Sequence, residues 1–133
     1  MQALVATKQA DLRLAIELYL VEEPGMDIVG TASEAAGLRS LARTTRPDLI
    51  MLDWDLPGHS PTSLLAELKR IDSCLQVIVL GKELEQRTVV LAAGADAFVL
   101  KGDPPGRLLT AIRQARAQRA TAENQIPTET KGA

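Results

Sequence analysis

The most informative residue in the chain is Asp53, an acid placed where a buried strand is predicted to end. Residues 49–52 form an apolar run before it, and a Pro57-Gly58 turn follows shortly after it. Open α/β sheets build their functional sites at the carboxyl ends of their strands. A carboxylate in such a place can act as a covalent nucleophile. We therefore take Asp53 as the candidate reactive group.

Alternating strand and helix patterns surround Asp53. Short apolar runs predict five strands, at residues 3–6, 26–32, 48–53, 76–80 and 97–100. Helical periodicity predicts five helices, at residues 11–21, 33–45, 61–71, 83–93 and 105–122. Ser33 is the expected N-cap of the second helix, and Gly94 closes the fourth. This alternation predicts an α/β domain whose parallel sheet is covered by helices on both faces.

The length and composition predict one globular domain. The 133 residues suffice for a core that needs neither disulfides nor metals. The lone Cys74 fits a reducing cytoplasm, and the only histidine, His59, has no cysteine or histidine near it, so we expect a loop residue rather than a zinc ligand. No apolar run has the length of a membrane span or the pattern of a secretory signal. We expect a domain of residues 1–120 and a polar, disordered tail or linker at 121–133.

Two motifs carry a family resemblance. Residues 47–58 read PDLIMLDWDLPG, and residues 98–101 read FVLK. Together they resemble the response-regulator receiver domain, the CheY-like module of two-component phosphorelays, over about residues 3–120. The resemblance implies a flavodoxin-like (βα)5 three-layer sandwich with strand order 2-1-3-4-5. It further implies that Asp53 is the phosphoacceptor and that Lys101 pairs with Asp53 or with its phosphoryl group, whose charge cations offset.

Several positions depart from the receiver pattern. Receivers carry two acids after the first strand that help to hold Mg²⁺, and here Thr7 and Lys8 stand at those positions. The Ser or Thr that follows the fourth strand in the family is Gly81, and the small residue after it is Lys82. Mg²⁺ prefers carboxylates and other oxygen ligands in octahedral geometry. We therefore expect weak or absent Mg²⁺ binding and no other cofactor.

The lysines suggest what replaces the metal. Our hypothesis is that Lys8, Lys101 and Lys82 surround Asp53 and favour its ionised form. Asp55 would restore neutrality if its side chain turned inward. A cation beside Lys8 would be repelled, because two like unit charges about 4 Å apart cost roughly 4 kcal/mol at an effective dielectric near 20. The alternative is that Lys8 and Lys82 extend their flexible stems into solvent.

Two aromatic residues are also expected to lie at the pocket around Asp53. Trp54 adjoins Asp53, and Phe98 stands at the position of the aromatic switch of receivers. In that family the ring moves together with the hydroxyl that follows the fourth strand, and Gly81 has no hydroxyl. A plain core aromatic is the alternative for Phe98.

The helices offer two candidate partner surfaces. Leu14, Leu18 and Val21 lie opposite the core-facing side of the first helix. Such a stripe can mark a protein contact, although scattered surface apolars are common. We expect a histidine kinase, another signalling protein or a second copy in a homodimer as partner. The arginines of the last helix are expected to form a solvated face, too sparse for nucleic acid. They are Arg107, Arg113, Arg116 and Arg119. The alternative implied by the resemblance is a protein contact, because receivers signal through a face made of the fourth helix, fifth strand and fifth helix.

The sequence favours a non-enzymatic receiver that acts as a protein-interaction switch with a degenerate acidic pocket. One alternative is a working phosphoacceptor that uses Asp53, Lys101 and a makeshift metal site from Asp53 and Asp55. Another is a domain that binds an anion or small ligand over the lysines. A flavin role has only the fold in its favour, because residues 7–10 lack a phosphate cradle. We expect no DNA-binding output domain in this sequence, with residues 121–133 either ending a protein that stands alone or forming a linker to a further part of a longer chain, and we expect no contact of this domain with nucleic acid or membrane.

Overall fold

The computed structural model describes the backbone of residues 1–58 and 60–132 and the side chains as far as residue 122; His59 lies outside the described residues. The strands form one parallel sheet in the order β2-β1-β3-β4-β5, which confirms the predicted topology. The strands are β1 (Gln2–Ala6), β2 (Asp27–Ala32), β3 (Leu49–Asp53), β4 (Gln76–Gly81) and β5 (Ala97–Leu100). The helices are α1 (Ala10–Val21), α2 (Ala35–Thr45), α3 (Pro61–Ile71), α4 (Gln86–Ala92) and α5 (Pro105–Gly132).

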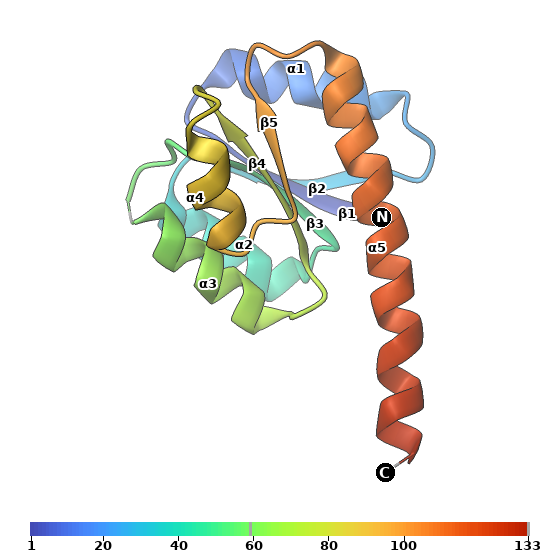
Figure 1. Ribbon diagram of the computed structural model, residues 1–133. Helices are drawn as coiled ribbons and strands as arrows, with labels where there is room; N and C mark the ends of the chain where they lie inside the picture. The colour runs from blue at the N-terminus through green and yellow to red at the C-terminus, as the bar shows by residue number, and fades with distance from the viewer. Residues whose placement is uncertain (59, 133) are drawn as a thin grey trace.

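The helices cover the sheet on both faces, as Figure 1 shows: α1 and α5 lie on one side, and α2, α3 and α4 lie on the other. Two apolar cores result, one on each face. Alternate residues of β3 enter the two cores, with Ile50 and Leu52 in one and Leu49 and Met51 in the other. All residues of β3 and β4 are buried, as expected for central strands of a parallel sheet. The polar end of β3 is thereby held in place by its apolar neighbours.

Two helices begin later than the sequence predicted. Residue Glu34, not Ser33, is the N-cap of α2, and its side chain makes no capping hydrogen bond. Helix α4 begins at Gln86 rather than at residue 83, because the residues before it form turns in which the N–H of Gln86 donates to the carbonyl of Glu83. Gly94 follows α4 with φ +111°, the left-handed conformation expected of a glycine that ends a helix.

Helix α5 is longer than predicted, since it runs to Gly132 where the sequence indicated a disordered tail. Its last part extends away from the body of the domain in Figure 1. Good helix formers continue past the last buried residue, Ala115, as far as residue 120, so over this stretch helical propensity outlasts the apolar period. The domain boundary at residue 120 stays a prediction. Within the described residues, no helix is both long and apolar enough to cross a membrane.

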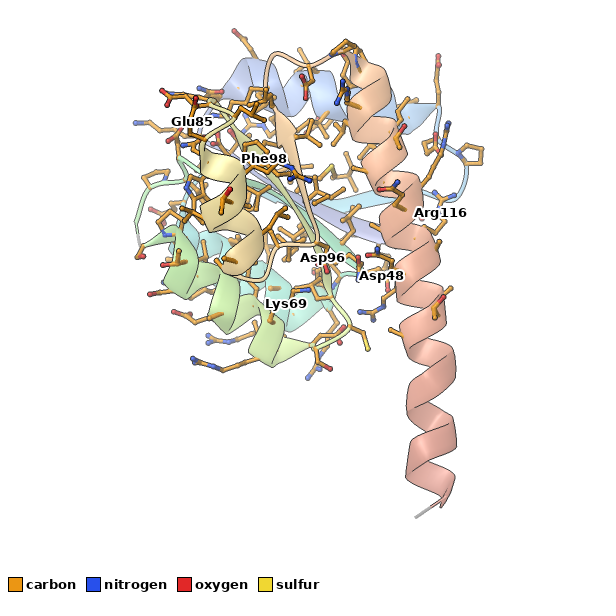
Figure 2. All side chains as sticks on the ribbon, viewed as in Figure 1. Asp48, Lys69, Glu85, Asp96, Phe98 and Arg116 are labelled. Atoms are coloured by element: carbon orange, nitrogen blue, oxygen red, sulfur yellow. The ribbon has the colours of Figure 1, made fainter. Side chains whose placement is uncertain are left out.

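The prediction that the arginines of α5 form a solvated face is wrong for Arg119, whose side chain is 15% exposed, whereas Arg113 stays 62% exposed although it also forms an ion pair. Arg113 pairs with Glu23 at 3.2 Å, and Arg119 pairs with Asp72 at 2.6 Å. Arg116 donates to a backbone carbonyl in the loop between α1 and β2, beside which Figure 2 shows it. The sequence could not reveal these contacts, because the partners lie 47 to 92 residues away along the chain. These arginines link α5 to the loops between α1 and β2 and between α3 and β4, which lie at the amino ends of the strands.

Candidate functional site

The carboxyl ends of four strands bring the candidate residues to one edge of the sheet. Ala6 of β1 is in register with Leu52 of β3, so Thr7 and Asp53 are neighbours at the strand ends. On the other side, Gly81 ends β4 and accepts a hydrogen bond from the backbone N–H of Lys101 at 2.9 Å. The sequence placed these residues at one edge, and the structure confirms that arrangement.

Asp53 is buried and engaged through both carboxylate oxygens. Only 2% of its surface is exposed. Its Oδ1 accepts from the Lys101 ammonium at 2.8 Å and from the backbone N–H of Asp55 at 2.9 Å. Its Oδ2 accepts from the Thr7 hydroxyl at 2.6 Å. An ionised carboxylate offers about four acceptor sites, and this network uses three of them.

Thr7 orients its hydroxyl through a second hydrogen bond. The side chain is fully buried, and its Oγ1 accepts from the backbone N–H of Gln9 at 3.0 Å. The hydroxyl proton is therefore directed at Asp53, and the lone pairs face the start of α1. Thr7 thus serves as a buried donor to the carboxylate, a role that the sequence did not reveal.

A second, more exposed layer of charge lies over this buried network. Asp55 approaches both Lys82 and Lys101 with its Oδ2, at 3.4 Å in each case. The Lys82 side chain is 60% exposed and that of Asp55 is 44% exposed, so solvent screens this contact and its contribution to stability is small. Asp55 thus turns toward two lysines, which is the condition under which the sequence predicts that it restores neutrality. Two acids and two lysines form a set with no formal net charge.

The prediction that Lys8 turns toward Asp53 is wrong. Lys8 is exposed, and among the described residues it forms no ion pair with either acid of the site. The buried Thr7 hydroxyl already occupies the side of Asp53 that faces β1. A flexible, strongly hydrated ammonium is then better placed in water. Lys82 also contacts Asp55 rather than Asp53, so Lys101 is the cation that the fold supplies to Asp53.

The two aromatic residues of the site, Trp54 and Phe98, pack against the same core. Trp54 is partly buried against the core under α2, α3 and α4, and its backbone N–H donates to the carbonyl of Leu80 at 2.9 Å. Figure 2 labels Phe98 on β5 and Glu85, the N-cap residue of α4. The Phe98 ring is also in contact range of Gly81, so this aromatic borders the site as well as the core.

These residues do not fit a magnesium ion. Receivers hold Mg²⁺ with acids after the first strand, where this chain has a hydroxyl whose proton is directed at Asp53 and an exposed lysine. The Lys101 ammonium occupies one oxygen of Asp53, and Asp55 faces two lysines. The described residues contain no group of three or more acids, histidines or cysteines that could hold a metal. Mg²⁺ would have to displace a resident cation without an added carboxylate to compensate.

Gln86 is a site residue that sequence reasoning missed. Its side-chain oxygen accepts from the backbone N–H groups of Lys82 and Glu83, at 2.9 and 3.2 Å. A signal was available, because a glutamine five residues after a strand-end glycine can reach back to the loop amides. For Thr7 the signal was its position directly after β1, which neighbours β3 in the expected strand order.

Comparisons with known proteins agree with this geometry. The family model described as "Response regulator receiver domain" matches residues 3–113. The nitrate/nitrite response regulator protein NarL of Escherichia coli K12 is 32% identical over 108 residues, which cover 80% of this chain and 50% of NarL. The transcriptional regulatory protein AfsQ1 of Streptomyces coelicolor is 36% identical over 115 residues, covering 85% of this chain and 49% of that protein. The chain spans about half the length of these relatives.

Solved structures share the fold at lower identity. The response regulator domain of Thermotoga maritima CheB superposes with a TM-score of 0.76 at 23% identity, covering 86% of this chain and 95% of that one. The receiver domain of a LuxO repressor protein from Vibrio parahaemolyticus gives 0.80 at 19% identity, with 92% and 94% covered. With the matched family model and the site at the carboxyl edge of a 2-1-3-4-5 sheet, the chain belongs to the response regulator receiver domain family of two-component signalling.

Proposed function

We propose that this receiver works as a protein-interaction module without phosphorylation of Asp53. The observation that carries the proposal is the engagement of both Asp53 oxygens by Thr7, Lys101 and the Asp55 N–H inside a buried site. The carboxylate is the anionic half of a fixed ion pair. The domain therefore holds one arrangement of its site in the absence of a phosphoryl group.

The arrangement opposes phosphoryl transfer in two ways. A carboxylate that attacks a phosphorus atom must direct a free lone pair at it, and hydrogen bonds to both Asp53 oxygens lower their nucleophilicity. Phosphoryl transfer also depends on cations that bridge the oxygens of the transferred group. Here Lys101 already neutralises Asp53, and Lys82 faces Asp55.

The two alternatives have less support. A working phosphoacceptor would need Asp55 as a metal ligand, whereas this acid contacts two ammonium groups. An anion-binding site would need lysines with unpaired charge, whereas Lys82 and Lys101 both face acids and Lys8 lies away from them. A receiver whose Asp53 is held in a fixed ion pair accounts for all of these contacts.

A phosphodonor experiment tests the proposal. The purified protein is incubated with a small phosphodonor and Mg²⁺, and its intact mass is measured. We expect no mass gain of one phosphoryl group, while a receiver domain that carries both acids is modified under the same conditions. The Asp53→Asn variant is the matched control, since it removes the acceptor. A phosphoryl gain in the wild-type protein that is absent in Asp53→Asn would overturn the proposal.

We further propose that the outer stripe of α1 contacts the partner protein. Leu14, Leu18 and Val21 are 56%, 61% and 80% exposed. Val21 also borders an open groove of about 500 Å³ between α1 and the edge strand β2, where Met26 and Ile28 contribute apolar walls. Exposed apolar side chains beside a groove are typical of a protein contact.

Substituting the centre of this stripe tests the contact. Leu18→Glu should leave the melting temperature within a few degrees of wild type, because Leu18 is exposed. The same change should abolish binding to a cognate histidine kinase or self-association in sedimentation. Val89→Glu on α4 is a matched control, since Val89 is 55% exposed and lies outside the stripe. Unchanged binding and sedimentation in Leu18→Glu would contradict this part of the proposal.

Two further proposals concern the activity and the location of the domain. The domain is proposed to have no catalytic activity of its own, although one relative, from Methanospirillum hungatei, is named a protein-glutamate methylesterase/protein-glutamine glutaminase. A cytoplasmic location remains our proposal, and the free thiol of Cys74, which is buried, accords with it.

A further inference from the structure

The carboxyl end of β4 has no room for a side chain. A Cβ atom built on Gly81 would lie 2.5 and 2.7 Å from two carbons of the Phe98 ring and 2.6 Å from the side-chain oxygen of Gln86. A carbon atom closer than 3 Å to a non-bonded carbon or oxygen is strongly repelled. Any side chain at residue 81 must therefore displace both Phe98 and Gln86. Gly81 is required here for the space it leaves, since its φ is not in the left-handed region.

Gln86 fastens the loop between β4 and α4 from its position as the first residue of α4. Its amide oxygen lies 2.9 Å from the backbone nitrogen of Lys82 and 3.2 Å from that of Glu83. One acceptor thus satisfies two consecutive backbone donors. Because the oxygen also lies over Gly81, the hydrogen-bonded position of Gln86 depends on the absence of a side chain there.

Phe98 closes the same space from β5. The residue is in register with Val79 of β4, and its ring packs against the core formed with α2, α3 and α4. The ring edge lies over Gly81 beside the Gln86 amide. The ring and the amide are therefore two neighbours in one confined space.

We infer that Gln86 and Phe98 are positioning residues that jointly hold the β4–α4 loop closed over Gly81. The inference deepens the proposed function and rests on it in one respect, namely that the loop takes this form without a phosphoryl group. A hydroxyl side chain would stand where the ring and the amide now lie. The closed loop therefore fills the place from which such a hydroxyl could contact a group on Asp53.

Amide hydrogen exchange, measured by NMR, tests the role of Gln86. Gln86→Leu should raise the exchange rates of the Lys82 and Glu83 amides by roughly fivefold or more, because both lose their acceptor. Gln86→Glu keeps an acceptor oxygen and should stay within about twofold of wild type. Gln114→Leu, an exposed glutamine on α5, is the matched control. Unchanged exchange of both amides in Gln86→Leu would overturn the inference.

Gly81→Ala tests whether the space is shared. The added methyl group should displace Gln86 and so raise exchange at the same two amides, and Phe98→Leu should reduce that effect by half or more in the double variant. Gly106→Ala adds a methyl group with no atom within 4 Å and is the control. An equal effect of Gly81→Ala with and without the Phe98 ring would refute the coupling.

The two proposals fail in distinguishable ways. Phosphorylation of the wild-type protein would overturn the ion-pair function but would leave the exchange results standing. Unchanged exchange in the Gln86 and Gly81 variants would refute the closed loop. The result of the mass measurement would still stand.

Discussion

Replacing Thr7 by valine should lower the free energy of unfolding by about 2 kcal/mol. The hydroxyl donates to a buried, charged oxygen of Asp53 at 2.6 Å, and a hydrogen bond to a charged group contributes roughly 1.5–3 kcal/mol. The backbone N–H of Gln9 loses its acceptor as well, which costs about 1 kcal/mol. The buried methyl group of valine returns about 0.8 kcal/mol. The near-equal volumes of threonine and valine keep packing changes small.

Urea denaturation at neutral pH, followed by the fluorescence of Trp54, measures this change. The same substitution should cost only about 1 kcal/mol in an Asp53→Asn background, because the acceptor there is neutral. The difference between the two costs is the coupling between Thr7 and the charge of Asp53. Equal costs in the two backgrounds would refute the reasoning, since the hydroxyl would then stabilise the fold without regard to the carboxylate.

Three further predictions follow from the ion pairs and the metal fit. Lys101→Met should lower the melting temperature by roughly 10 °C, because it leaves Asp53 buried without its cation; a shift under about 2 °C would exclude a stabilising pair. Millimolar Mg²⁺ should leave the fluorescence of Trp54 without a saturable change, and saturable quenching would show a metal site that our account lacks. The hydrogen bond from Arg113 holds the pKa of Glu23 below its ordinary value of 4.5, so this pair stabilises the fold above that pH and the stabilisation is lost as the pH falls through the lowered pKa. Arg113→Met should flatten the acid side of the stability–pH curve, and an unaltered curve would contradict that assignment.

The sequence predicted the fold well because its strongest signals are local. The apolar runs of β3 and β4 are buried at every residue, and Gly94 ends its helix as expected. Once the strand order was given by the family resemblance, the meeting of Asp53 and Lys101 at one edge followed from topology.

The details of the site were less predictable because they depend on which side chains occupy the space around Asp53. Lys8 and Thr7 are adjacent in sequence, and the buried threonine rather than the lysine contacts Asp53. The charges of the site suggested that the lysine would pair with Asp53. Because this strand end is buried, the smaller and less hydrated threonine side chain makes the contact instead. The hydrogen bond that the Gln86 side chain accepts from the loop was likewise not predictable from the sequence, because it depends on the turns before α4.

The free energy of unfolding of Asp53→Asn, measured without Mg²⁺ at neutral pH, tests the central claim most directly. If Asp53 is the anionic half of a fixed ion pair, the substitution leaves Lys101 without its closest partner, since Asp55 lies farther away at 3.4 Å. The free energy of unfolding is then expected to fall by about 2 kcal/mol. A gain in stability would contradict the fixed ion pair, because that result is expected of a carboxylate that repels neighbouring acids in a pocket awaiting a metal.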